Sequence, residues 1–334
     1  MSYANFEYGS LLPFIAKMPL RVGSLVTHGR GVLNAVLDRD WRSIALNSKF
    51  VADSTRQALK DIHSTTESGL APTTRLRFEH WLYRRFVAAA YEEWQANLIA
   101  FNRVNELAFD GIKDHQNLPK QLIIATIHFD SPMLGLVKLG DWGRPICALS
   151  SSIVEDSRVP VEIRSHFNRK YRAMAGHWHG GRCMHKESEL RGFIEAAHAG
   201  FSLAVFCDAP GVIGGNAGGH DRGSTDIVGN EPGADEAFSM KKNKGVWLNF
   251  IGRRRLIAPI IPRLLERTNL PVVGMVCTRT RFDKYKIRFS DVFTSQLPGQ
   301  SAQRLYDFFS ECIVERPFSW WACDLLPNYP LKLG

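Results

Sequence analysis

The sequence predicts an α/β protein with a mostly parallel central sheet flanked by helices and a helical N-terminal region. Two observations support this class. From about residue 121 onward, short apolar runs typical of buried strands alternate with segments of helical periodicity. Before residue 113, by contrast, the apolar residues recur at helical spacing. We therefore expect a helical region over residues 1–112 that packs on an α/β core over residues 113–334.

The composition limits the kinds of partner. The chain has 334 residues, 45% of them hydrophobic and 22% charged, as is usual for a packed soluble protein. Its net charge of +9 favours an anionic partner such as nucleic acid, a membrane surface or an acidic carrier. We expect no nucleic acid, because the basic residues are scattered and form no recognised binding motif. The six cysteines form no CxxC pair, a pattern typical of reduced thiols in a cytoplasmic protein.

The N-terminal region is expected to consist mainly of helices. Residues 11–26 are apolar but are interrupted by Lys17 and Arg21, so we expect no membrane span, which needs about 20 apolar residues. The segment fits an amphipathic helix on a bilayer and a core-packing helix equally well. Further helices are expected over 31–63 and 75–109, and no signal peptide is expected. A cationic stripe that could meet anionic headgroups comprises Arg75, Arg77, Arg84 and Arg85.

The stretch 121–140 carries the main candidate for chemistry. Residues 122–127 form a β-branched apolar run typical of a buried strand, and His128 follows where the run ends. Ser131 and Pro132 look like the N-cap and first position of a short apolar helix. We expect His128 in a loop beyond the carboxyl end of the strand, where ligands of open α/β sheets bind. A histidine there can take a proton from a hydroxyl or amine, although a structural loop histidine fits the pattern too.

The alternation of strands and helices continues to the C-terminus. Strands are expected over 145–149, 202–207, 246–251, 272–278 and 285–289, and helices over 158–175, 187–199, 257–268 and 301–314. Asp208 ends one of these strands and so occupies the same topological position as His128. Its carboxylate could orient the imidazole and stabilise the protonated form. Asp130 is the local alternative.

Two other segments stand out. The Gly-rich segment 209–245 is too long for an ordinary connection, so it is expected to be a functional lid or a disordered insertion. It lacks the GK[ST] of a phosphate-binding loop. Residues 177–185, HWHGGRCMH, contain zinc-ligand types, but their spacing matches no familiar finger. We expect a polar, substrate-facing loop there and no metal.

Several segments resemble, in this order, the late acyltransferases of lipid A biosynthesis, the lauroyl and myristoyl transferases of the lysophospholipid-acyltransferase-like superfamily. IHFDSPMLG stands where that family has a strand followed by a His-x4-acid motif. The other similar segments are RSIALNSKF, FIEAAHAGFSLAVFCD, KGVWLNFIG, LPVVGMVCTR and ERPFSWWACDL. The likeness spans about residues 12–325 in short pieces, and the ordered set is more specific than any single motif.

The chain also departs from the family pattern. Met133 stands where the family has its acid, and a thioether cannot orient a histidine by charge. Either Asp130 or Asp208 substitutes for that acid, or the pair is broken. The Gly-rich insertion and the shortened or missing hydrophobic anchor also differ from the family, which suggests an acceptor other than lipid A.

The resemblance implies an acyltransferase that uses no cofactor and forms no covalent enzyme intermediate. It would move a fatty acyl group from a thioester of acyl carrier protein or coenzyme A to a hydroxyl or amine of a lipid, glycolipid or specialised metabolite. His128 would be the base, with Asp130 or Asp208 as its catalytic partner. The candidate substrate-binding residues are Arg164, Arg182 and Ser131, the arginines contacting a phosphate or the developing oxyanion. We expect a cytoplasmic protein, peripheral at the inner membrane. The alternative is an inactive relative that binds lipid or a partner protein.

Overall fold

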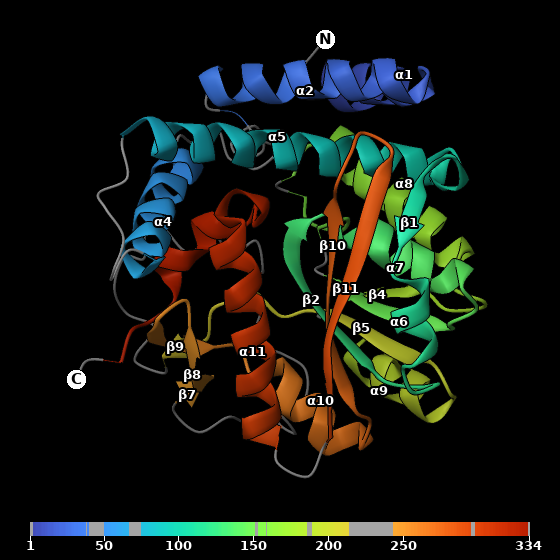
Figure 1. The fold of residues 1–334 in the computed structure, drawn as a ribbon. Coiled ribbons are helices and arrows are strands. Elements are labelled where there is room, and N and C mark those ends of the chain that lie inside the picture. The colour runs from blue at the N-terminus through green and yellow to red at the C-terminus, as the bar shows by residue number, and fades with distance from the viewer. Residues whose placement is uncertain are drawn as a thin grey trace.

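The computed structural model confirms the α/β class, with a central sheet, helices on its faces and a helical N-terminal region (Figure 1). It describes residues 3–37, 39, 50–66, 75–150, 153–157, 159–185, 189–213, 243–294 and 298–332.

The seven-stranded sheet has the order β1-β11-β10-β2-β5-β3-β4. Its strands are β1 (Ala108–Asp110), β2 (Ile123–Asp130), β3 (Ile146–Ser150), β4 (Cys183–His185), β5 (Ser202–Phe206), β10 (Val272–Arg279) and β11 (Lys284–Phe293). The neighbours β10, β2, β5, β3 and β4 are parallel, and β11 turns back antiparallel to β10 as a hairpin. The carboxyl ends of the parallel strands therefore reach one edge of the sheet.

Helices cover both faces of this sheet. One face packs against α9 (Leu190–His198), α10 (Ile260–Thr268) and α11 (Pro298–Glu315), and the other against α7 (Pro132–Asp141) and α8 (Val161–Gly176). In β2, Ile123 belongs to the first core and Ile124 to the second, and both are fully buried. A strand buried on both faces has to be apolar at nearly every position, which explains the unbroken run that predicted it.

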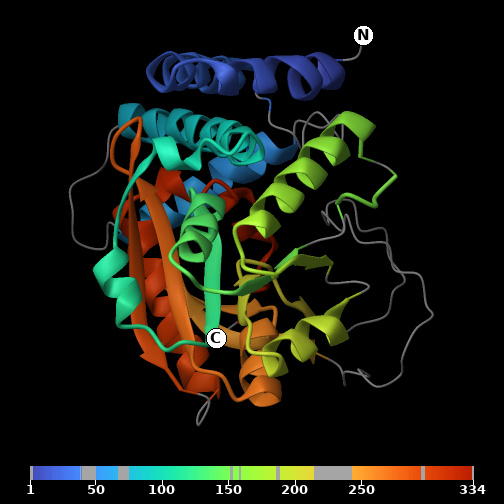
Figure 2. The ribbon, with the colours of Figure 1, turned by 90° about the vertical axis from the view of Figure 1, so that its right-hand side faces the viewer.

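The N-terminal helices form two further layers above the carboxyl edge of the sheet (Figures 1 and 2). The long helix α5 (Arg75–Ala100) crosses that edge, and η1 (Asn5–Leu11), α1 (Leu12–Lys17) and α2 (Leu20–Leu37) lie on α5. Arg30 of α2 joins these layers through ion pairs with the buried Glu7 and with Glu93 of α5. None of the helices in the described ranges combines the length and the apolar character that crossing a bilayer requires.

The remaining elements lie outside the seven-stranded sheet and its main covering helices. They are α4 (Phe50–Thr66), η2 (Val104–Glu106), α6 (Ile112–Gln116), β6 (Val212–Ile213), β7 (Asn243–Lys244), β8 (Val246–Phe250), β9 (Arg253–Ile257), η4 (Pro317–Ser319) and η5 (Cys323–Asn328). The antiparallel pair β6–β7 brings together the two ends of the Gly-rich segment. Residues 214–242, which make up most of the predicted lid or insertion, lie outside the described residues.

Some predicted boundaries differ from the observed ones. The predicted helix 31–63 corresponds to parts of two helices, α2 and α4, and residues 40–49 lie outside the described part of the chain. β1 falls within the region 1–112 that was expected to be helical, because a three-residue strand leaves no recognisable pattern. β9 went unrecognised because it opens with three arginines. The prediction that His128 follows its strand in a loop was wrong, since β2 continues to Asp130.

Candidate active site

His128 and Asp208 meet at the carboxyl edge of the sheet, where their neighbouring parallel strands end. His128 Nδ1 lies 2.8 Å from Asp208 Oδ1, and the His128 backbone N–H donates to Asp208 Oδ2 at 2.8 Å. One histidine therefore engages both oxygens of the carboxylate, which fixes the orientation of its ring. Because Nδ1 faces the carboxylate, we assign the proton of the neutral ring to Nδ1, which leaves the lone pair of Nε2 free to act as a base.

The two side chains differ in their access to solvent. The Asp208 side chain is 1% exposed and the His128 side chain 29% exposed. Trp320 Nε1 also donates to Asp208 Oδ2, at 2.9 Å. Burial by itself would raise the pKa of Asp208, but the charge of His128 and hydrogen bonds from His128 and Trp320 hold that pKa below its usual value. The carboxylate is therefore ionised at neutral pH while the imidazole stays within reach of a substrate.

Aromatic side chains enclose the imidazole. Its ring stacks on Phe206 with the ring centroids 4.4 Å apart and meets the edge of Trp321 at 4.8 Å. The Trp321 backbone N–H donates to the His128 carbonyl at 3.1 Å, and the adjacent Trp320 forms an antiparallel bridge with Phe129. The C-terminal segment thus forms a wall of the site. In the sequence, the paired tryptophans Trp320 and Trp321 are the signal for this role.

Asp130, the other candidate partner of His128, faces different groups. It ends β2 with a left-handed backbone, φ +54°. Its Oδ2 accepts the Arg279 backbone N–H at 2.9 Å and lies 3.6 Å from Arg316 Nη2, and its Oδ1 accepts the Ser131 hydroxyl at 3.1 Å. Of the two carboxylates that the sequence offered, the structure brings Asp208 to the imidazole and turns Asp130 toward arginines.

Ser131 and Met133 are both buried at the start of α7. Ser131 occupies the predicted N-cap position, but its hydroxyl accepts a hydrogen bond from Gln95 of α5 at 2.9 Å and makes no capping bond. Ser131 is fully buried. Met133 packs in the core between α7 and the sheet. Asp208, two residues beyond the end of β5, is the carboxylate that lies beside His128.

The two arginines proposed to bind substrate do not meet His128. Arg182 is exposed and directly precedes the edge strand β4. The strand pairing aligns Cys183 with Ile124 of β2. Ile124 precedes His128 by four residues, so Cys183 and His128 are offset by about 13 Å along the strand direction. Arg164 lies in the first turn of α8, half-buried, and its Nε has no hydrogen-bond partner among the described residues.

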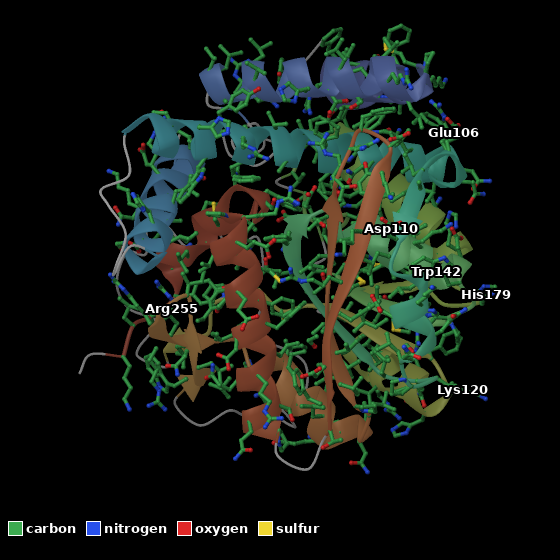
Figure 3. All side chains as sticks on the ribbon, in the orientation of Figure 1. Glu106, Asp110, Lys120, Trp142, His179 and Arg255 are labelled. Carbon is green, nitrogen blue, oxygen red and sulfur yellow. The ribbon has the colours of Figure 1, made fainter. Side chains whose placement is uncertain are left out.

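The histidines of the segment 177–185 serve local contacts. His177 Nδ1 lies 2.7 Å from Asp141 Oδ1 at the end of α7, and His185 Nδ1 lies 3.3 Å from the Ser150 hydroxyl. Figure 3 shows the intervening His179 at the periphery of the molecule. Within the described ranges, no three His, Cys, Asp or Glu side chains are grouped closely enough to hold a metal ion. α7 starts at Pro132, close to the site, and ends at Asp141. His177 contacts Asp141 and therefore lies at the end of α7 that is far from the site.

Three arginines, Arg84, Arg279 and Arg316, gather around Asp130. Arg279 is the last residue of β10. Its position at a strand end, like that of Asp208, is a sequence signal that could have identified it. Arg84 was noted only as part of a cationic stripe. That stripe is not a continuous exposed surface, because Arg85 is fully buried and lies 3.4 Å from Asp324.

No family model matches the sequence, and no curated protein matches it.

Proposed function

We propose that the protein is an acyltransferase that moves a fatty acyl group from an acyl thioester to a hydroxyl or amine acceptor. The observation that carries this proposal is the pair formed by His128 Nδ1 and the buried Asp208 Oδ1 at 2.8 Å. An imidazole oriented by a carboxylate through one nitrogen is a general base at the other. The position of the pair, at the carboxyl edge of an α/β sheet, is a usual place for a ligand.

The chemistry needs only the imidazole and two substrates. His128 Nε2 removes the proton from the acceptor hydroxyl or amine as its oxygen or nitrogen attacks the thioester carbonyl. Asp208 stabilises the imidazolium that forms. When the tetrahedral intermediate collapses, the carbon–sulfur bond breaks and the imidazolium returns its proton to the departing thiolate. The products are an ester or amide and a free thiol, and the enzyme is unchanged.

Trp321 offers a hydrogen-bond donor for the oxyanion of that intermediate. Its indole ring contacts the His128 ring, and its buried Nε1 has no hydrogen-bond partner among the described residues. A buried donor without a partner is rare in proteins and calls for an explanation. We assign it to the developing oxyanion, a role earlier given to Arg164 or Arg182.

The donor we propose is the thioester of acyl carrier protein or coenzyme A, and the acceptor is a lipid, glycolipid or specialised metabolite. The net charge of +9 suits both an acidic carrier protein and the phosphates of coenzyme A. The likeness to the late lipid A acyltransferases supports the same donor class.

We propose further that the protein works at the cytoplasmic face of a membrane, bound through its N-terminal helices. Exposed apolar side chains occur along the N-terminal helices, and in α2 they lie at positions other than those buried against the protein. They are Tyr3, Phe6, Phe14, Val22, Leu25, Val26, Leu33, Val36 and Leu37. The one acidic residue of the stretch 3–37, Glu7, is buried against Arg30, while Lys17 and Arg21 are exposed. Apolar side chains flanked by cations are typical of helices that lie in a bilayer interface.

Purified protein given acyl thioesters of several chain lengths, each with a panel of lipid and metabolite acceptors, tests the activity. We expect thiol release above background with at least one pair and a product whose mass has increased by one acyl group. Absence of both across the panel would favour the alternative, a catalytically inactive protein that binds lipid or a partner.

A further inference from the structure

Three arginines that the mechanism above does not use gather around Asp130, two residues beyond His128 on β2. Arg84 comes from α5, Arg279 ends β10, and Arg316 directly precedes η4. They surround Asp130, which accepts the Arg279 backbone N–H at 2.9 Å and lies 3.6 Å from Arg316 Nη2. Among the described residues, Asp130 is the one carboxylate that forms an ion pair with any of the three. The cluster therefore carries three positive charges and one negative charge.

Aromatic rings hold two of these guanidinium groups. Arg279 lies over the ring of Tyr91 at 3.2 Å from its centroid, and Arg84 lies over Phe318 at 3.5 Å. A guanidinium stacked on a ring by its flat face keeps its N–H groups at the edge, where they can donate to an anion. Both arginines are half-buried, so a ligand there would be partly shielded from water.

The electrostatics favour adding an anion to this cluster. Burial lowers the pKa of Arg84, and the positive charges of Arg316 and Arg279 lower it further, while Asp130 only partly opposes them. Mutual repulsion of this kind is relieved by a bound negative charge. Half-buried cations brought together without matching carboxylates are a common feature of phosphate sites.

We propose that Arg84, Arg279 and Arg316 bind a phosphate group of a substrate while His128 acts on it. Calling the ligand a substrate rests on the acyltransferase function proposed above. Asp130 lies two residues beyond His128, or about 7 Å along the strand, so the phosphate would lie close to the reacting atoms. The pantetheine arm of a thioester donor places its phosphate many bonds from the sulfur. The short separation therefore favours a phosphate on the acceptor.

Binding of two matched pairs of small probes tests this site and separates the two sources of phosphate. Hexyl phosphate is compared with hexanol for the acceptor, and phosphopantetheine with pantetheine for the donor, by isothermal titration calorimetry. We expect hexyl phosphate to bind at least about tenfold more tightly than hexanol, as charge-assisted hydrogen bonds allow. A preference confined to phosphopantetheine would keep the phosphate site and reassign it to the donor.

Removing the charges should remove the preference. The double variant Arg84→Gln/Arg279→Gln should lose about tenfold or more in affinity for the phosphorylated probe and little for its neutral partner. Arg191→Gln, which removes an exposed arginine on α9, is the matched control and should bind like the wild type. Arg279→Lys keeps the charge and should retain part of the preference, which separates a lost site from a misfolded variant.

Two results would overturn the proposal: no preference for phosphate in either pair, or a preference that survives in the double variant. The binding measurement needs no turnover. A protein that cleaves no thioester can still bind the phosphorylated probe, and an active acyltransferase can fail to bind it, so the two proposals fail separately.

Discussion

The His128 imidazole is restrained on several sides before any substrate arrives. Asp208 fixes Nδ1, Phe206 stacks on one face of the ring, and Trp321 meets the ring edge-on. A base held in its working orientation need not lose rotational freedom during the reaction. The exposed part of the ring is then the part available to a substrate.

The carboxylate of Asp208 should be required for turnover. Asp208→Asn keeps the size of the side chain but removes the charge that stabilises the imidazolium, so we expect kcat to fall about 10²- to 10⁴-fold with little change in KM. Steady-state kinetics of thiol release measure both constants. Asp141→Asn is a matched control, because Asp141 also pairs with a histidine, His177, at 2.7 Å but at the far end of α7. Equal losses in both variants would contradict the role of Asp208.

Asp208 should also make stability depend on pH in the acid range. Its pKa is lowered in the folded state, so the unfolded chain binds the proton more tightly. The resulting stabilisation is present above the pKa of an unfolded aspartate, about 3.9, and is lost as the pH falls through the lower folded pKa. Urea unfolding at a series of pH values should show a steeper loss of unfolding free energy for the wild type than for Asp208→Asn. If the unfolding free energies of the two proteins changed equally with pH, the ionised form of Asp208 would not be stabilised in the folded state.

The sequence identified His128 and Asp208 but could not choose between Asp208 and Asp130. Both acids lie at strand ends, and Asp130 is nearer along the chain. The choice depends on the left-handed backbone of Asp130 and on Arg279 and Arg316, which lie about 150 or more residues away along the chain. Such contacts form only when the strands pair, so no local pattern records them.

At the scale of elements, the long apolar and amphipathic segments were predictable and the short ones were not. β2, β5, α7 and the β10–β11 hairpin lie close to their predicted ranges because burial demands a clear pattern in each. Gly200 follows α9 with φ +94°, a left-handed conformation that glycine commonly adopts after a helix. β1 and β4 have only three residues each, and their pairing partners alone define them.

The exposed apolar side of α2 should bind anionic vesicles. Leu25 is 74% exposed and Val36 is 77% exposed, so Leu25→Asp/Val36→Asp should leave the fold stable while placing charge on the face that would enter the bilayer. In sedimentation with phosphatidylglycerol vesicles, we expect binding of the double variant to weaken by about tenfold or more, since two apolar contacts are lost.

A control on another surface tests whether the location of the change matters. Val314→Asp introduces one negative charge at an exposed apolar position of α11. It should bind vesicles like the wild type. If the wild type does not sediment with vesicles, or if the α2 double variant sediments equally well, the N-terminal helices do not mediate membrane binding.

The layers of the whole molecule bring the proposed membrane face and the active site to the same end. The outer helices α1 and α2 lie on α5, and α5 crosses the sheet edge at which β2 ends (Figure 1). Gln95 of α5 reaches Ser131 directly beyond β2, so α5 also supports the site. An acceptor held in a bilayer would meet the protein on the side where His128 lies. The net charge of +9 would help to attract both the membrane and an acidic donor.

The rate of acyl transfer by His128→Ala relative to the wild type tests the central claim most directly. Thiol release and acylated product are measured for both proteins with the best thioester and acceptor, after circular dichroism has shown that the variant is folded. Loss of the general base predicts a fall of about 10²-fold or more in kcat. A folded His128→Ala protein that transfers acyl groups at the wild-type rate would contradict the account.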